Sequence, residues 1–159
     1  MADLAVVTMR LQQDRNLAVL VTTRPDQLDP QVSVVNVGVI GHPVTTEPVA
    51  ALVGRPGAKL VNLRATARAT LVVRAGWEWV AVRGPVELAG PDDPHPDIPA
   101  GRVATLLQAV YVAAGGEHQD LAEYDRVMVA ERRCVVLIHP ERVWSNPPGA
   151  QHLDPEPAT

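Results

Sequence analysis

The sequence predicts a mainly β domain with flanking helices, built as a small closed or split antiparallel barrel of about six strands. Short valine-rich runs recur along the 159-residue chain, and β-branched residues favour strands. Several of these runs are joined by links of hairpin length, which favours antiparallel pairing. Strands and helices do not alternate regularly, as a doubly wound parallel sheet requires. About six strands with few natural edges are typical of such a barrel.

The first half of the chain is predicted to contain one helix and three strands. The helix covers residues 3–13, where Asp3 can cap the first turn and apolar residues recur at helical spacing. Residues 24–30 include Pro25 and Pro30 and are predicted to form a turn. The strands are residues 17–23, 31–39 and 49–53.

The second half is predicted to add three strands and three helices. Ala75 and Gly76 form a tight turn between two strands, and the prolines of residues 91–97 exclude regular structure there. Asp120 and Glu123 have the spacing of a capping box. The strands are residues 69–74, 77–88 and 133–139, and the helices begin near residues 57, 103 and 120.

Bulk composition indicates a single globular domain over residues 1–146, followed by a Pro-rich C-terminal tail over residues 147–159. The net charge of −4 argues against a broad nucleic-acid surface. The lone cysteine, Cys134, excludes an internal disulfide, fits a reducing cytosol and is expected to be a buried apolar residue. No apolar run is long enough for a membrane span and no signal-peptide pattern begins the chain, so we expect a cytoplasmic protein.

The segment from Gly54 to Arg64 predicts an anion site. A β-type run ends at a Gly/Pro turn, and a helix follows at once with Arg55 before it and Lys59 in its first turn. A helix N-terminus has unpaired N–H groups and a partial positive charge, so it suits a phosphate. Neither a Walker P-loop nor a dinucleotide-binding glycine motif is present. The alternative is that Arg55 and Lys59 are solvated surface residues.

Two further strand segments have the composition of a binding surface. The strand around Ser33 and Asn36 has polar side chains on both faces, which suits either a ligand with donors and acceptors or a solvated edge. Trp77 and Trp79 lie on one side of a strand. They can flank a planar ring, anchor a subunit interface or pack in the core.

Metal-dependent and hydrolytic chemistry find no support in the sequence. None of the five histidines pairs with Cys, Asp or Glu at metal-site spacing on a regular element, so no metal is expected. His95 lies among aspartates in a Pro-rich stretch and is expected to be a solvated loop residue. No nucleophile–base pair stands out. A site that binds a phosphate and a planar ring but has no acid–base pair suits a redox cofactor, because such a cofactor supplies the chemistry itself.

With these motifs the chain resembles the pyridoxamine-5′-phosphate-oxidase-like split-barrel flavoproteins, and most closely the actinobacterial branch that uses the deazaflavin coenzyme F420. The resemblance covers residues 15–149. The motifs that carry it are Pro30-Gln31-Val32-Ser33, residues 58–64 with Ala67-Arg68-Ala69, Gly76-Trp77, Gly115-Gly116-Glu117-His118, Arg132-Arg133 and Pro147-Pro148-Gly149.

The resemblance implies a homodimer of six-stranded FMN-binding split barrels with cofactor sites at the subunit interface. Lys59 and the turn before it would hold the cofactor phosphate, the Ser33 strand would run beside the ring system, and Trp77 and its neighbours would come from the partner subunit. The family often has an arginine two positions before the lysine, where this chain has Gly57, so either Arg55 substitutes or the phosphate is held less tightly. The implied cofactor-binding residues are Ser33, Val34, Val35, Asn36, Arg55, Gly57, Ala58, Lys59, Asn62, Gly76, Trp77, Glu78 and Trp79.

The resemblance therefore implies an oxidoreductase that transfers a hydride from reduced F420 to an electron-poor conjugated small molecule, such as an enone or quinone. The sequence predicts no catalytic acid or base for it. FMN is the alternative cofactor. A non-catalytic protein that binds a flavin, haem or another tetrapyrrole is the alternative from a different class. Oxidation of pyridoxamine phosphate is disfavoured because no second basic cluster is visible in the sequence.

Overall fold

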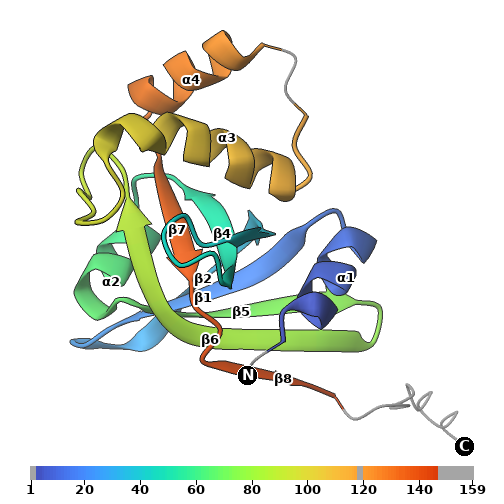
Figure 1. Cartoon of the computed structure of the whole chain (residues 1–159). Coiled ribbons are helices and arrows are strands. Elements are labelled where there is room, and N and C mark those ends of the chain that lie inside the picture. Colours follow the sequence, from blue (N-terminus) through green and yellow to red (C-terminus); the bar gives the residue numbers. More distant parts are fainter. Residues whose placement is uncertain (1–2, 118–119, 147–159) are drawn as a thin grey trace, which may run out of the picture.

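The computed structural model describes residues 3–117 and 120–146 (Figure 1). The predicted tail, its Pro147-Pro148-Gly149 motif and His118 lie outside the described residues. The helices are α1 (Ala5–Gln13), α2 (Ala58–Thr66), α3 (Val103–Ala113) and α4 (Leu121–Ala130), with a short 3-10 turn, Ala100–Arg102, before α3. The strands are β1 (Leu17–Arg24), β2 (Gln27–Asn36), β3 (Gly38–Gly41), β4 (Pro48–Gly54), β5 (Arg68–Ala75), β6 (Glu78–Ala89), β7 (Cys134–Ile138) and β8 (Arg142–Ser145).

All strand pairs are antiparallel, in the order β2-β1-β5-β6-β7-β4-β3, and β8 pairs with β6 outside this path. The long strand β6 connects the two halves of the sheet. Its first part, up to Pro85, pairs with β5 and β8, and its last four residues pair with β7. The result is the predicted split barrel, with α1 and α2 at its ends, α3 packed over β3, β4 and β7, and α4 packed against α3 (Figure 1).

The described residues contain eight strands, so the prediction of six was wrong in number. The run predicted as one strand over residues 31–39 is divided at Val37, whose N–H bonds to the Asn16 carbonyl (2.8 Å) instead of a strand partner. The second additional strand, β8, is four residues long and pairs with β6 after the chain has passed the end of β7. A run this short has no recognisable periodicity of its own.

The predicted turn over residues 24–30 was also too long. The chain reverses within Pro25 and Asp26, and β2 already begins at Gln27. Arg24 holds the turn with two side-chain hydrogen bonds to the Asp26 carboxylate (3.1 and 3.2 Å). Pro30 therefore lies inside β2, and β2 is an edge strand, where a residue without an N–H is tolerated.

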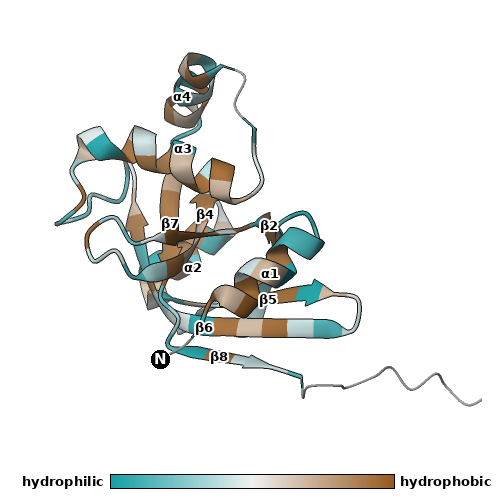
Figure 2. Cartoon of the chain, turned by 45° about the vertical axis from the view of Figure 1, so that its right-hand side comes forward, coloured by the Kyte–Doolittle hydropathy of each residue, from teal (hydrophilic) through white to brown (hydrophobic). Residues whose placement is uncertain are grey.

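Two apolar clusters meet on opposite faces of β4 and β7. The larger cluster fills the barrel, and the smaller one lies between α3 and the sheet, where Leu107 and Val110 of α3 contact Val135 and Leu137 of β7. Figure 2 shows β4 and β7 coloured as hydrophobic beneath α3, which itself has both hydrophobic and polar segments. All five residues of β7 are consequently buried. Burial raises the pKa of Cys134 to about 12, so its thiol stays protonated and behaves as the apolar residue that was expected.

Gly84 lies where the chain leaves β7 and crosses β6 to form β8. A Cβ atom at this position would lie 1.8 Å from the His139 carbonyl oxygen. The crossing is fixed by backbone hydrogen bonds from His139 to Pro85 (2.9 Å) and from Glu141 to Arg83 (3.1 Å). Any side chain at Gly84 would therefore clash with a backbone carbonyl that cannot easily move.

None of the described helices has the length and apolar character needed to cross a lipid bilayer.

We expect the substitution Gly84→Ala to lower the free energy of unfolding by about 3 kcal/mol or more, because the added methyl group meets a fixed carbonyl instead of a flexible side chain. Urea unfolding followed by circular dichroism measures this loss. Gly101→Ala is the matched control, since a Cβ atom there meets nothing within 4 Å, and its effect should stay within about 0.5 kcal/mol. Equal effects of the two substitutions would contradict the crossing described here.

Candidate functional site

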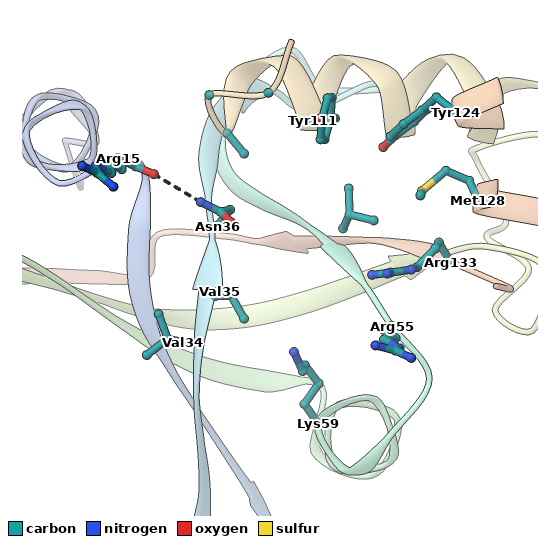
Figure 3. A pocket seen from close by; sticks show the side chains of 14 residues that line it. Arg15, Val34, Val35, Asn36, Arg55, Lys59, Tyr111, Tyr124, Met128 and Arg133 are labelled. Atoms are coloured by element: carbon teal, nitrogen blue, oxygen red, sulfur yellow. Dashed lines mark hydrogen bonds between the residues drawn. The ribbon is translucent and has the colours of Figure 1, made fainter. Parts of the chain in front are cut away.

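A cavity of about 540 Å³ lies between the barrel and the two upper helices (Figure 3). Its lower wall comes from the end of β4 and the start of α2, its side from β2, and its upper wall from α3 and α4. The lining residues are Arg15, Val34, Val35, Asn36, Val53, Arg55, Lys59, Tyr111, Ala114, Gly115, Gly116, Tyr124, Met128 and Arg133. Four of them are cationic and none is acidic, although the protein carries a net charge of −4.

Arg55, Lys59 and Arg133 form a cationic cluster at the lower side of the cavity (Figure 3). Burial lowers the pKa of Lys59, and the positive charges of Arg133 and Arg55 lower it further. Neither Arg55 nor Lys59 makes a side-chain hydrogen bond or ion pair with the described residues, whereas Arg133 pairs with Glu131 (2.7 Å). Cations that repel one another in a partly buried cavity are stabilised by a bound anion.

The N-terminus of α2 lies on the same side of the cavity as the cationic cluster, because Lys59 is in the first turn of this helix. Gly57 precedes the helix with φ 155° and ψ −171°, a conformation essentially restricted to glycine. No side chain caps the first turn of α2, so its end remains open to an external acceptor. An arginine at position 57 would be strained in this backbone. This backbone conformation accounts for glycine at position 57.

The opposite wall of the cavity is aromatic and apolar. Tyr111 of α3 and Tyr124 of α4 have ring centroids 4.9 Å apart, and Met128 lies beside them (Figure 3). The Tyr124 hydroxyl donates a hydrogen bond to the Leu107 carbonyl (3.2 Å), and burial raises its pKa to about 12. Tyr124 therefore stays protonated at neutral pH, and this wall provides a surface for a planar or apolar group.

The predicted strand around Ser33 contributes side chains at one edge of the cavity. Val34, Val35 and Asn36 line it, and the Asn36 side-chain amide donates to the Arg15 carbonyl (3.2 Å). The Ser33 hydroxyl is buried and has no hydrogen-bond partner among the described residues. Buried polar groups are almost always paired, so this hydroxyl is an exception among the described residues.

The other predicted site residues lie away from this cavity. Asn62 is on α2 but is buried, and its side-chain amide donates to the Thr22 hydroxyl (3.1 Å), so it joins α2 to β1. The predicted tight hairpin is present, with Gly76 at φ 63°. The other predicted site residues of this hairpin are Trp77, Glu78 and Trp79. Trp77 is 63% exposed, Glu78 forms an ion pair with Arg10, and Trp79 is at the start of β6. Their approach to a partner subunit's site stays a prediction.

Sequence reasoning gave no site role to Arg15, Tyr111, Tyr124 or Arg133. The pair Arg132-Arg133 was visible as a motif, but nothing in its local pattern says that only Arg133 enters the cavity. The sequence did not indicate that a third cation joins Arg55 and Lys59. The chain brings Arg133 to them because β7 pairs with β4, whose end carries Arg55.

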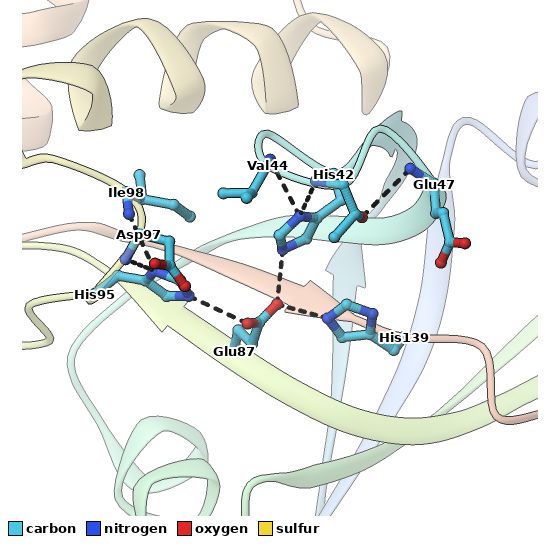
Figure 4. Close-up of polar contacts among 9 residues, drawn as sticks. His42, Val44, Glu47, Glu87, His95, Asp97, Ile98 and His139 are labelled. Atoms are coloured by element: carbon cyan, nitrogen blue, oxygen red, sulfur yellow. Dashed lines mark hydrogen bonds and ion pairs between the residues drawn. The ribbon is translucent and has the colours of Figure 1, made fainter.

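A second polar centre lies on β6, where three histidines surround Glu87 (Figure 4). The Nε2 atoms of His42, His95 and His139 lie 2.7, 3.2 and 2.5 Å from the Glu87 carboxylate. Burial alone would raise the pKa of Glu87, but the hydrogen bonds from the three histidines outweigh it and lower the pKa to about 2. The side chain of His95 is only 7% exposed, so its predicted solvated position was wrong.

Three of these side chains, His42, Glu87 and His139, also have ligand atoms within 4.8 Å of one another, as a metal site requires. The second ring nitrogen of His42 argues against that use. Nδ1 of His42 accepts from the Val44 and Thr45 N–H groups, and Nδ1 of His95 likewise accepts from two backbone N–H groups.

A neutral imidazole whose Nδ1 accepts must carry its proton on Nε2, where it is donated to Glu87. Histidines that bind a metal through Nε2 instead donate from Nδ1. The geometry thus favours a hydrogen-bonded cluster that fixes the loop at residues 91–97 and the turn after His42 onto β6.

No known protein-family profile matches the chain. Solved structures resemble it instead. A conserved hypothetical protein of Mycobacterium tuberculosis has a TM-score of 0.65 at 18% identity, over 99% of this chain and 94% of that one. A pyridoxamine 5′-phosphate oxidase-related, FMN-binding protein of Nostoc punctiforme has a TM-score of 0.60 at 16% identity, over 90% of this chain and 84% of that one.

A haem-binding protein of Mycobacterium smegmatis has a TM-score of 0.54 at 19% identity, and the match spans 91% of this chain but only 54% of that one. At such identities the likeness establishes the fold. This chain has the split-barrel fold of the pyridoxamine 5′-phosphate oxidase-like proteins, as its sequence predicted, and that fold carries both flavin-binding and haem-binding proteins.

We expect Glu87→Gln to destabilise the protein by about 1–2 kcal/mol at pH 7. This is less than the full shift of the Glu87 pKa implies, because the side chain is 34% exposed and solvent screens its charge. Since the pKa of Glu87 is lowered from 4.5 to about 2, its contribution is complete above pH 4.5 and is lost as the pH falls toward 2. Urea unfolding of both proteins between pH 7 and pH 2 measures this. A difference independent of pH would contradict the ionised cluster.

Lys59 is the only lysine in the chain, so its ionisation can be measured directly. Reductive methylation with carbon-13 formaldehyde labels Lys59 and the N-terminal amine, and NMR follows each resonance with pH. We expect the pKa of Lys59 to lie below 10.5, because of burial and the neighbouring arginines, and to rise when inorganic phosphate is added. A value of 10.5 that phosphate does not change would contradict an anion site here.

Proposed function

We propose that this protein is an oxidoreductase that binds coenzyme F420 in the cavity beside α2. The observation that carries the proposal is the meeting of a cationic cluster, Arg55, Lys59 and Arg133, with an apolar and aromatic wall in one cavity. This arrangement suits a ligand with a phosphate at one end and a planar ring system next to it. The buried Ser33 hydroxyl, on the same strand as the lining residues Val34 to Asn36, supports a ligand or partner there.

Each part of the cavity then has a role. The cationic cluster and the open N-terminus of α2 bind the phosphate, and the strand from Ser33 to Asn36 runs beside the ring. When bound, a reduced deazaflavin supplies a hydride to an electron-poor conjugated acceptor. Tyr111, Tyr124 and Met128 exclude water from that side and help to align the two reactants. Tyr124 stays protonated at neutral pH because its pKa is about 12, so it does not act as a base there.

The proposal includes a homodimer with the cofactor sites at the subunit interface. In one chain the exposed Trp77 lies in a turn that contributes nothing to the cavity, so a partner subunit is needed to bring it there. Exposed aromatic residues of this size are enriched at subunit interfaces. Trp79, Glu78 and Gly76 would approach with it from the same hairpin.

FMN is the second candidate cofactor, because a protein of the same fold from Nostoc punctiforme is FMN-binding. Its single phosphate monoester suits the same cationic cluster. A carrier without catalysis differs from both candidates in turnover rather than in binding. Steady consumption of reduced F420 in the presence of an added quinone or enone supports the enzyme, and tight binding without consumption supports the carrier.

We expect Lys59→Ala to weaken the binding of F420 by about 10- to 100-fold, because it removes a charge-assisted contact to phosphate from a partly buried site. Fluorescence titration of the purified protein with F420, and separately with FMN, gives the dissociation constants. The parent protein should bind F420 more tightly than FMN.

Arg126→Ala is the matched control for loss of one positive charge, since Arg126 is paired with Glu123 on the solvated side of α4 and lines none of the cavity. It should change either dissociation constant by less than about twofold. An unchanged affinity in Lys59→Ala would remove the phosphate site from the proposal, and tighter binding of FMN would reverse the choice of cofactor.

A further inference from the structure

We infer that His42 and His95 form an acid-sensitive latch that attaches the start of α3 to the barrel. Each imidazole donates to Glu87 through one ring nitrogen and accepts from backbone N–H groups through the other (Figure 4). A proton on the accepting nitrogen ends the second set of contacts, so the latch opens in mild acid. The inference concerns the polar centre on β6 and is independent of the proposed cofactor.

The first observation is that the two histidines use the same local geometry. Nδ1 of His42 accepts from the N–H groups of the second and third residues after it, both at 3.2 Å. Nδ1 of His95 does the same, at 3.1 and 3.2 Å. Two segments that are far apart in the sequence therefore depend on an unprotonated Nδ1. The donor residues are Val44, Thr45, Asp97 and Ile98.

The second observation is the burial of these two imidazoles. The side chains of His42 and His95 are only 4% and 7% exposed, so water has little access to them. A protonated imidazole donates from both ring nitrogens and accepts at neither. A proton on Nδ1 would therefore face two N–H donors in a buried position, which is unfavourable. The bond to Glu87 is retained on protonation, so the backbone segment moves away from the imidazole.

His139 lies on the same carboxylate but lacks this contact. Its Nε2 atom is 2.5 Å from Glu87, and its side chain is partly exposed. Its Nδ1 atom has no hydrogen-bond partner among the described residues. His139 can therefore take up a proton without disturbing the backbone, and it provides the internal control.

Glu87 remains the fixed point of the latch in mild acid. Burial raises its pKa, but the hydrogen bonds from the three histidines outweigh this effect and lower the pKa to about 2. Imidazole is the side chain that ordinarily titrates between about pH 5 and about pH 8. Mild acid therefore changes the imidazoles and leaves the carboxylate ionised.

Other charged groups surround the cluster without contacting the accepting nitrogens. Among the described residues, the hydrogen bonds to Nδ1 of His42 and His95 come from backbone N–H groups alone. The ring of His139 lies 5.2 Å from that of His42, between centroids. Backbone contacts thus decide whether a proton is accommodated at Nδ1. The charged side chains nearby are Asp3 before α1, Glu47 before β4, Glu87 of β6, Asp97 of the loop, Arg102 before α3 and Glu141 after β7.

The two latched segments both support the start of α3. Ile98 is buried in the smaller apolar cluster with Leu107 of α3. The Arg102 side chain, just before α3, donates to the Pro43 carbonyl in the turn after His42 (3.5 Å). The turn, the loop and α3 also enclose a cavity of about 210 Å³. Opening of the latch therefore admits water to the smaller cluster and leaves the cluster inside the barrel unchanged.

The first half of the loop is held by ion pairs instead. Asp93 pairs with Arg64 of α2 (2.7 Å), and Asp92 pairs with Arg132. These contacts do not involve the histidines. Acid therefore releases the loop only from His95 onward, and the opening is local.

Amide hydrogen exchange, followed by NMR between about pH 7.5 and about pH 5 and corrected for the intrinsic exchange rate, tests the latch. Each open segment binds one proton more than the closed one. We therefore expect protection of the four donor amides to fall by up to about tenfold for each unit that the pH falls. Protection in β4 and β7 should change by less than about twofold over the same range.

The double variant His42→Asn/His95→Asn removes the two titrating groups. The asparagine side-chain oxygen accepts from the same kind of N–H group in an Asx turn, so the caps are retained. We expect the pH dependence of the four donor amides to disappear. His139→Asn is the matched control and should respond to pH as the parent protein does. Thermal unfolding at neutral pH verifies that each variant is folded.

Long-range proton–nitrogen NMR correlation spectra of the parent protein at neutral pH identify the tautomer of each histidine without any variant. The inference requires the proton of His42 and of His95 on Nε2, and a proton on Nδ1 of either overturns it. Donor amides that keep their protection in mild acid also overturn it, as does an equal loss of protection in β4 and β7. A double variant that responds to pH like the parent assigns the response to another group. If the double variant does not fold, the tautomers and the exchange of the parent protein decide.

Discussion

The pairing of β6 with three different strands is the constraint on which the rest of the structure depends. One strand of twelve residues holds β5 and β8 along its first part and β7 along its last part, so the two halves of the sheet cannot move independently. The change of partner needs a residue without a side chain at Gly84, where the chain crosses the strand. Because β7 is then fixed beside β4, Arg133 and Arg55 come together although they are far apart in the sequence.

The molecule has two polar centres, and at each of them a partly buried charge needs partners that stabilise it. The charge is negative at the first centre and positive at the second. At Glu87 a carboxylate is surrounded by three imidazole N–H donors from the chain itself, so its charge is stabilised internally. At Arg55 and Lys59 the charges have neither hydrogen-bond nor ion-pair partners within the described residues and are held close to Arg133. The first centre is complete within one chain and maintains the fold. Under the proposed function the second is completed by an anion from outside, which is the physical difference between a structural cluster and a binding site.

Local signals in the sequence were sufficient for the elements that depend on neighbouring residues. The Gly57 turn with the helix after it, the Gly76 hairpin and the Asp120 cap were all predicted, and the cap is made by the Glu123 N–H (3.0 Å) as expected. Predictions failed where the determining contact is distant in sequence. Glu87 lies 45 and 52 residues from His42 and His139, and no spacing rule connects them. The division of the predicted strand at Val37 likewise depends on a carbonyl of a different turn.

The upper wall of the cavity is built on the least anchored helix of the described chain. No residue of α4 is buried, and its side-chain hydrogen bonds to α3 run from Tyr124 to the Leu107 carbonyl and from Gln108 to Asp125 (2.7 Å). Local unfolding of α4 therefore requires far less free energy than opening β4 or β7, which are buried on both faces. Amide hydrogen exchange should be fast in α4 and slow in the barrel. A ligand seated against Tyr124 and Met128 would slow exchange in α4 first, so this helix reports occupancy of the cavity through its own stability.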